Sequence, residues 1–217
     1  MGKAAFTPAL GRLGHANLYD PIMALTGEQR WRRQAVQQLA PQAGEVVVDV
    51  GCGTGTLTLQ LRRAAAQARI IGVDPDAEVL SIAQAKAQRA GLAIEWQQAM
   101  GDALVAQLGE GSVDKLVSSL VLHQCPMPMK RAILASMHAL LRPGGRLVIA
   151  DFGLQRTWLM RMAFRIVQMA DGKTDTQPNA DGVLPQLIAE AGFVAVREAA
   201  VIPTLTGSVS IYVAGKP

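Results

Sequence analysis

Short apolar runs and longer amphipathic stretches alternate along the chain. Runs rich in Val, Ile and Leu that end at Gly, Pro or Asp are typical of buried strands. Stretches with apolar residues three and four positions apart are typical of helices. The pattern predicts strands at 46–50, 69–74, 92–97, 113–120 and 146–151. It predicts helices between them at 56–67, 76–90 and 126–141.

The last part of the chain breaks this alternation. A helix is predicted at 182–191, and two strand-like runs follow at 194–202 and 208–214 with only a short link between them. Strands that alternate with helices indicate a parallel sheet, whereas two adjacent strands indicate a hairpin. We therefore expect an α/β fold: a seven-stranded, mostly parallel sheet with a C-terminal antiparallel hairpin and helices on both faces.

The junction between the first strand and its helix carries the strongest motif. Residues 45–55 read Glu-Val-Val-Val-Asp-Val-Gly-Cys-Gly-Thr-Gly, so three glycines, Gly51, Gly53 and Gly55, follow an apolar β-branched run. Glycine permits a sharp backbone turn and lets a ligand approach the chain closely. This arrangement indicates a cradle for a nucleotide or nucleoside.

The glycine spacing and one acid indicate the kind of ligand. A dinucleotide fingerprint has Gly-x-Gly-x-x-Gly, but here Thr56 stands where its third glycine would be. Asp49 directly precedes the loop. A carboxylate repels a pyrophosphate and attracts an ammonium or sulfonium group. The loop therefore favours a cationic nucleoside without phosphate.

With these features, residues 45–55 resemble motif I of the class I S-adenosylmethionine (SAM)-dependent methyltransferases. The resemblance extends over about residues 40–214 and implies a Rossmann-like fold with SAM as cofactor and S-adenosylhomocysteine as product. It implies that Asp49 lies close to the methionine amino group. It further implies that the loop itself contacts the cofactor through Gly51, Cys52, Gly53, Thr54 and Gly55.

The ends of the following strands supply the other expected cofactor contacts, because ligands of open α/β sheets bind at the carboxyl ends of strands. The resemblance implies that Asp74 binds the ribose hydroxyls, with Pro75 beside it, whereas Asp76 is expected to cap the next helix. It implies that Asp102 and Ala103 contact the adenine, although a helix cap is an open alternative for Asp102. The backbone of the fourth strand's end is expected to line the methionine and methyl end of the cofactor. That group comprises Ser118, Ser119 and Leu120.

Two residues are candidates for chemistry on the methyl acceptor. His123 follows the fourth strand and has the pKa range of a general base, but a packing role is an equal alternative. Asp151 ends the fifth strand, where it could orient the acceptor or act as a structural cap. Residues 118–126 lack the Asn/Asp-Pro-Pro-aromatic motif of enzymes that methylate nucleic-acid bases. They instead resemble the small-molecule branch, with the Leu-x-x-Leu-His of enzymes similar to ubiquinone/menaquinone-biosynthesis C-methyltransferases.

Two segments are expected to cover the site. The first is an N-terminal helical cap over residues 1–40, part of the same domain as residues 41–217, in which Tyr19 contacts the cofactor or serves as a plain apolar anchor. The second is a lid insertion at about 154–181. Its residues 155–170 combine large apolar side chains with three arginines. This mixture indicates either that the segment covers an apolar acceptor pocket or that it contacts another surface. Residues 171–179 are expected to form a mobile loop.

Composition narrows the partners only slightly. The formal net charge is +4, and the two cysteines, Cys52 and Cys125, form neither a disulfide framework nor metal-ligand spacing, so no metal is expected. No apolar run is long enough for a membrane span and no secretion signal is apparent, so we expect a cytoplasmic protein. Nucleic-acid binding is not expected, peripheral membrane contact is an open alternative, and monomer and homodimer are both open.

These features together predict a SAM-dependent methyltransferase that acts on a small, lipophilic or aromatic acceptor. The alternatives are a SAM- or nucleoside-binding module without catalysis and, less favoured by the loop, an NAD-linked oxidoreductase. The acceptor and the atom that is methylated are not apparent from the sequence.

Overall fold

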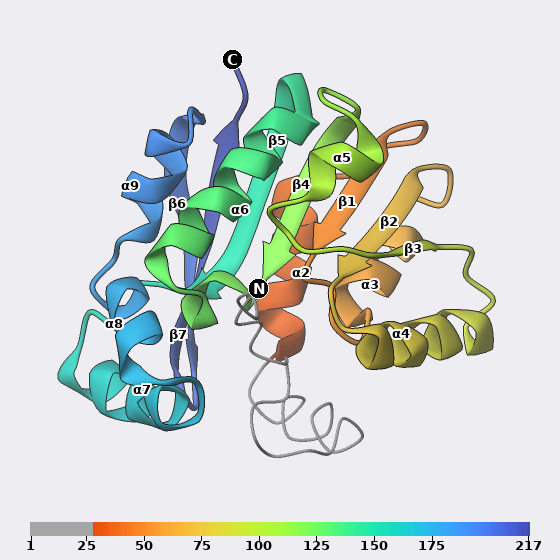
Figure 1. The fold of residues 1–217 in the computed structure, drawn as a ribbon. Coiled ribbons are helices and arrows are strands. Elements are labelled where there is room, and N and C mark those ends of the chain that lie inside the picture. Colours follow the sequence, from red (N-terminus) through yellow and green to blue (C-terminus); the bar gives the residue numbers. More distant parts are fainter. Residues whose placement is uncertain (1–27) are drawn as a thin grey trace, which may run out of the picture.

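The computed structural model describes residues 28–217, which form a three-layered α/β structure around one seven-stranded sheet (Figure 1). The strand order is β3-β2-β1-β4-β5-β7-β6. Their bounds are β1 Val46–Val50, β2 Arg69–Asp74, β3 Glu95–Gln98, β4 Val113–Ser119, β5 Leu141–Phe152, β6 Val194–Thr204 and β7 Gly207–Gly215.

Five of the strands are parallel and the last two form the hairpin. β1 pairs in parallel with β2 and β4, β2 with β3, and β4 with β5, whereas β7 lies antiparallel between β5 and β6. The fold class predicted from the sequence is therefore confirmed. The strand order reverses between β1 and β4, and this switch point is where open α/β sheets bind ligands.

Helices cover both faces of the sheet (Figure 1). Their bounds are α2 Glu28–Leu39, α3 Thr56–Ala64, α4 Ala77–Arg89, α5 Leu104–Leu108, α6 Met127–Leu140, α7 Trp158–Asp171, α8 Lys173–Ala180 and α9 Leu184–Glu190, with a 3-10 turn, η2, at Leu122–Gln124. Apolar side chains of α5, α6 and α9 pack on one face of the sheet. Those of α2, α3 and α7 pack on the other.

The strand pleat explains how one sheet supplies two cores. In β4, Leu116 faces the core under α6, and its neighbour Val117 faces the core under α2 and α3. In β5, Leu147 likewise faces the core under α6, and Val148 faces the core under α2 and α3. Successive side chains of a strand point to opposite faces, so a central strand buried on both sides reads as a continuous apolar run.

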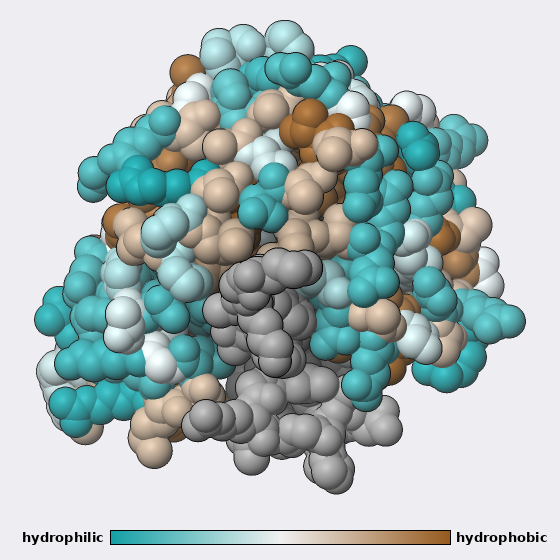
Figure 2. Space-filling view, viewed as in Figure 1, coloured by the Kyte–Doolittle hydropathy of each residue, from teal (hydrophilic) through white to brown (hydrophobic). Residues whose placement is uncertain are grey.

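The region after β5 differs from the sequence-based prediction. Residues 173–180 form α8 and not a loop, although this helix contains Pro178. Contacts from distant parts of the chain support it: Lys130 donates to the carbonyl of Asp175, and Asn179 donates to the carbonyl of Phe152. Tertiary contacts here outweigh the low helix propensity of the segment. Figure 2 shows that the surface over α8 is largely hydrophilic.

The N-terminal cap is described in part. α2 lies within the predicted helical cap, and its Trp31, Ala35 and Leu39 are buried against the sheet. Tyr19 lies outside the described residues, so its predicted contact stays a prediction. The domain division and the lid at about 154–181 likewise stay predictions. Among residues 28–217, no helix combines the length and the apolar character that crossing a membrane requires.

Candidate functional site

The glycine loop leaves β1 and returns to the sheet at β2 before α3 begins. The backbone N–H groups of Gly51 and Cys52 both donate to the carbonyl of Val73, at 2.8 and 3.0 Å. Gly51, Gly53 and Gly55 all have positive φ angles, of 72, 53 and 76°. L-residues with a side chain rarely adopt this conformation, so the turn requires its glycines.

Packing separates the three glycines by role. A Cβ atom on Gly51 would lie 2.2 Å from Val121, and one on Gly55 would lie 2.7 Å from Trp96. A Cβ atom on Gly53 would have no described neighbour within 4 Å. Gly51 and Gly55 are therefore needed for packing within the protein, while Gly53 borders open space at the middle of the loop.

Asp74 ends β2 and holds the same loop. Its carboxylate accepts hydrogen bonds from the backbone N–H of Gly53 at 2.9 Å and of Asp76 at 3.0 Å. Burial raises the pKa of Asp74, and these two hydrogen bonds partly oppose the shift. The side chain of Asp76 accepts from the N–H of Glu78, so its predicted role as the helix cap is confirmed.

Asp49 lies beneath the loop and is completely buried. One carboxylate oxygen accepts from Thr58 Oγ1 at 2.7 Å, while the other has no hydrogen-bond partner among residues 28–217. Burial raises its pKa to about 7, and the hydrogen bond from Thr58 and the charge of Arg32 partly oppose this rise. Because a buried polar atom is normally paired, the second oxygen of Asp49 is a candidate contact for a polar or cationic ligand.

The remaining loop residues have less reactive surroundings. Burial raises the pKa of the Cys52 thiol well above its ordinary value, which favours an inert thiol. Thr54 Oγ1 accepts from Lys86 Nζ of α4 at 2.9 Å. The carbonyl of Pro75 accepts from the side chain of Gln98 in β3. Contact of these residues with a cofactor stays a prediction.

The ends of β3 and β4 place the other predicted cofactor residues. Asp102 and Ala103 are exposed between β3 and α5, and the cap position of α5 is Ala103, so Asp102 does not cap this helix. At the end of β4, Ser118 donates to the carbonyl of Val50 at 2.8 Å and is buried. The two residues that follow are partly exposed: Ser119, and Leu120, whose φ is 54°.

His123 and Asp151 meet at the ends of β4 and β5. His123 Nδ1 lies 2.8 Å from Asp151 Oδ1, and Asp151 Oδ2 accepts from the backbone N–H of Leu122 at 2.7 Å. The other ring nitrogen, Nε2, lies 3.3 Å from a carboxylate oxygen of Asp171 at the end of α7. The imidazole is nearly buried, and this cluster joins two strand ends to the end of α7.

The charge of His123 follows from these partners. Burial alone lowers the pKa of the imidazole, but the adjacent carboxylates of Asp151 and Asp171 outweigh it and raise the pKa to about 9. At neutral pH the ring is then protonated and donates from both nitrogens. A general base must be unprotonated, so a base role for His123 requires that Asp171 first move away.

Sequence reasoning did not identify Lys130, which completes this cluster from α6. The side chain is fully buried, and its Nζ donates to the backbone carbonyls of Leu122, His123 and Asp175. It therefore connects η2 to α8. No local signal marks this lysine, because its three acceptors are backbone groups of two other segments.

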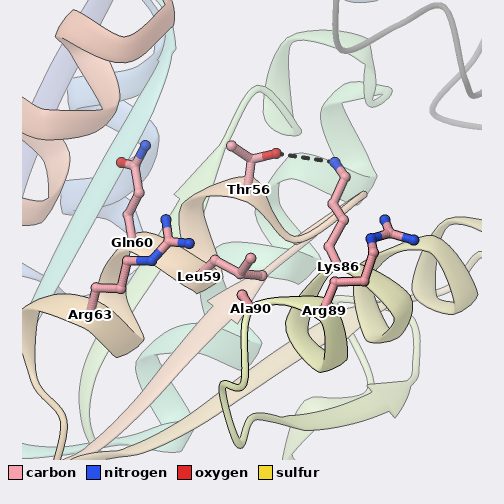
Figure 3. A pocket seen from close by; sticks show the side chains of 7 residues that line it. All are labelled: Thr56, Leu59, Gln60, Arg63, Lys86, Arg89 and Ala90. Atoms are coloured by element: carbon pink, nitrogen blue, oxygen red, sulfur yellow. Dashed lines mark hydrogen bonds between the residues drawn. The ribbon is translucent and has the colours of Figure 1, made fainter.

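A separate hollow lies on the outer surface between α3 and α4 (Figure 3). Its volume is about 410 Å³. It is lined by Thr56, Leu59, Gln60, Arg63, Lys86, Arg89 and Ala90. Lys86, which lines this basic hollow, also donates to Thr54 of the glycine loop. The acidic residues predicted to bind the cofactor do not line the hollow. Within residues 28–217, no cluster of His, Cys, Asp and Glu could hold a metal ion.

Comparison with known sequences places the motif in a family. Residues 47–145 match the family model described as a methyltransferase domain. Over 143 residues, the chain is 32% identical to the ubiquinone/menaquinone biosynthesis C-methyltransferase UbiE of Rubrivivax gelatinosus, which covers 66% of this chain and 53% of that relative. It is 29% identical over 175 residues to an uncharacterized methyltransferase of Synechocystis, with coverage of 79% and 77%. The chain thus spans about half the length of the first relative.

Solved structures share the fold. Phosphoethanolamine N-methyltransferase 2 of Haemonchus contortus, solved in complex with S-adenosyl-L-methionine, aligns with a TM-score of 0.75 at 14% identity. The alignment covers all of this chain and 61% of that one. The similarity extends through the C-terminal hairpin.

Proposed function

The chain carries a methyltransferase domain of the class I, SAM-dependent type, and from this premise we propose that it transfers a methyl group from SAM to a small, lipophilic or aromatic acceptor. The observation that carries the proposal is the acidic glycine loop. It combines a buried Asp49, one of whose carboxylate oxygens has no hydrogen-bond partner within residues 28–217, with a turn that is open at Gly53 and with Asp74 at the next strand end.

These residues fit SAM better than a dinucleotide. Asp49 supplies an anionic oxygen for the ammonium group of the methionine part, and a pyrophosphate at the same place would be repelled. Asp74 is oriented by two backbone N–H groups and keeps acceptor capacity for ribose hydroxyls. Bound SAM supplies an electrophilic methyl group on a sulfonium centre.

The other cofactor contacts form part of the same proposal. Asp102 and Ala103 bind the adenine from the exposed segment after β3, and Tyr19 closes over the methionine part. Ser118, Ser119 and Leu120 line the methyl end through their backbone. Methyl transfer is an in-line displacement, so the main tasks of these residues are to orient the two reactants and to exclude water.

The acceptor is proposed from the relatives and from the lid segment. UbiE of Rubrivivax gelatinosus is named as a C-methyltransferase of ubiquinone and menaquinone biosynthesis. In this chain α7 and α8 follow β5, α8 contacts η2, and Asp171 at the end of α7 faces His123, so we propose these two helices as the lid on the acceptor side. Beside His123, the rings of Phe152 and of Phe164 in α7 pack against each other, and these apolar surroundings suit a lipophilic or aromatic acceptor better than a charged one.

His123 and Asp151 are proposed to position the acceptor side of the site. As an imidazolium between two carboxylates, His123 holds η2, β5 and α7 in one arrangement. An acceptor that must lose a proton can use His123 as a base after the contact with Asp171 opens. The two roles predict opposite pH dependence, which is considered in the Discussion.

Two measurements test the proposal. Calorimetric titration should detect binding of SAM and S-adenosylhomocysteine and no binding of NAD. Incubation with labelled SAM and a metabolite extract, followed by mass spectrometry, should then identify a labelled small-molecule product. Binding of NAD without SAM would refute the proposed cofactor. Binding of SAM with no product in any lipophilic fraction would favour a nucleoside-binding module without catalysis.

A further inference from the structure

The lid helix α7 presents large apolar side chains to solvent. One face of the helix is packed, since Phe164 and Val167 are buried in the core. Elsewhere on the helix, five large side chains are between 50% and 87% exposed. They are Trp158, Leu159, Met162, Ile166 and Met169. We call these five residues the α7 apolar stripe.

The stripe lies on one side of the helix and is larger than ordinary surface exposure explains. Trp158, Met162, Ile166 and Met169 follow one another at spacings of four, four and three residues, which places them on one face. Single exposed apolar residues are normal, whereas a contiguous exposed patch marks an interaction site.

Basic residues border the stripe. Arg161 and Arg165 are exposed on the same helix, and exposed Lys173 begins α8. The acid at the end of α7, Asp171, is engaged by His123. Residues 155–170 contain three arginines and no acid; Arg156 is paired with Glu198, so Arg161 and Arg165 supply the local positive charge beside the stripe.

The turn between β6 and β7 lies next to α7. The turn between β6 and β7 holds Leu205, which is highly exposed. Its neighbour Gly207 lies against Phe164 of α7, so this turn and the helix are adjacent. The turn therefore lies against the packed face of α7, and Leu205 is a further exposed apolar side chain near this helix.

We propose that the α7 apolar stripe docks this protein on an anionic lipid surface. An amphipathic helix with Trp and Leu on one face and Arg beside them lies in the plane of a membrane interface, with the apolar side chains inserted and the cations near lipid phosphates. A helix of 14 residues is about 21 Å long.

Docking at this place would also suit the proposed reaction. The stripe belongs to the segment proposed as the lid on the acceptor side, so a lipophilic acceptor could pass from the bilayer to the site without crossing water. The docking itself does not depend on methyl transfer, because vesicle binding is measured without donor or acceptor.

Co-sedimentation with vesicles tests the proposal on the full chain. The protein should bind vesicles of phosphatidylglycerol and phosphatidylcholine, and bind vesicles of phosphatidylcholine alone at least tenfold more weakly. The double variant Met162→Ser/Ile166→Ser should lose at least tenfold in binding, while Val194→Ser, an exposed apolar residue on β6, should bind as the parent does. Arg161→Gln/Arg165→Gln should weaken binding more than the charge-matched Arg63→Gln/Arg89→Gln on α3 and α4.

Tryptophan fluorescence gives a readout that does not depend on variant stability. Trp31 is buried and Trp96 is partly buried, so Trp158 is the tryptophan of residues 28–217 that is highly exposed. Anionic vesicles should shift the emission to shorter wavelength, and Trp158→Phe should abolish that shift. Equal binding to neutral vesicles, no shift of Trp158, or a concentration-dependent dimer that buries Trp158 in the absence of lipid would each overturn the proposal.

Discussion

His123 Nδ1 lies 2.8 Å from Asp151 Oδ1, and this contact joins the turn after β4 to the end of β5. The opposite ring nitrogen faces Asp171, so one imidazole connects the sheet to α7. Because the same two carboxylates raise the pKa of His123 to about 9, the connection is strongest when the ring is protonated. The stability of this region should therefore depend on pH.

The stability contribution of His123 should decrease as the pH rises from 6.5 to about 9. Its pKa in the folded chain exceeds its ordinary value, so the folded state holds the proton more tightly than the unfolded state. The contribution is fully present below pH 6.5 and is lost as the pH passes the folded pKa. The shift corresponds to about 3 kcal/mol at most. Urea unfolding of the parent and of His123→Asn should show a difference in unfolding free energy that shrinks over this range.

His138 provides the matched control for this measurement. Burial lowers the pKa of His138 below the ordinary value. Its titration therefore changes the stability of the fold only at pH values below about 6.5. His138→Asn should therefore leave the slope between pH 6.5 and about 9 unchanged. A parent protein whose slope equals that of His123→Asn would contradict the protonated cluster.

The activity should also distinguish a positioning role of His123 from a base role. If the imidazolium positions the lid, turnover falls as the pH rises through about 9. Asp171→Asn removes one of the charges that raise the pKa, so the fall should move to lower pH. A base role predicts the opposite, a rate that rises with pH. His123→Ala at saturating SAM adds a second measure, because a loss below about tenfold excludes general-base catalysis.

Local sequence patterns predicted the fold well, and they placed the glycine loop and Asp74 at neighbouring strand ends, whereas the contact of these residues with a cofactor stays a prediction. The runs at Val46–Val50 and Arg69–Asp74 end in turn residues, and the structure has strands with these bounds. The resulting sheet brings the glycine loop and Asp74 together, as a hydrogen bond from Gly53 to Asp74 shows. These features depend on neighbours in sequence and on the general rule for strand ends.

The arrangement around His123 could not be predicted because its contacts are distant in sequence. The segment that became α8 is polar and contains Pro178, and it is stabilised by Lys130 from α6 and by the carbonyl of Phe152. In the same way, nothing near His123 indicates that Asp171 would face it. The pairing of two distant side chains decides the charge of this histidine.

Asp74→Ala should weaken SAM binding by about 2–3 kcal/mol, because charge-assisted hydrogen bonds to the ribose are lost. Calorimetric titration measures the effect. Asp76→Ala is the matched control: it removes the cap of α4 and should cost about 1 kcal/mol of stability with little effect on SAM. Unchanged affinity in Asp74→Ala would remove Asp74 from the cofactor site.

Substitutions of the loop glycines should separate effects on folding stability from effects on SAM binding. Gly55→Ala combines a positive φ with a Cβ atom 2.7 Å from Trp96, so it should lower the unfolding free energy by more than about 2 kcal/mol. Gly53→Ala has only the positive φ and should cost about 1–2 kcal/mol. Its methyl group enters the open space assigned to the cofactor, so its SAM affinity should fall more than its stability. Thermal unfolding without SAM and titration with SAM give the two quantities.

SAM binding should strengthen as the pH rises through about 7, the pKa to which burial raises Asp49. Below that pH the free protein carries a neutral carboxyl group, and a cationic ligand must first displace its proton. The affinity should therefore fall by up to about tenfold for each pH unit below 7. The range of about pH 5.5 to 7.5 is suitable, because an α-amino group loses its own proton near pH 8.

Asp49→Asn should bind SAM more weakly and without this pH dependence, whereas Asp102→Asn, at an exposed position, should keep the dependence of the parent. Comparison of two ligands then identifies the cation that Asp49 contacts. S-adenosylhomocysteine keeps the ammonium group and lacks the sulfonium charge, so an equal pH dependence for both ligands assigns Asp49 to the ammonium group. A dependence seen with SAM alone would assign it to the sulfonium centre, and none with either ligand would place Asp49 outside the binding site.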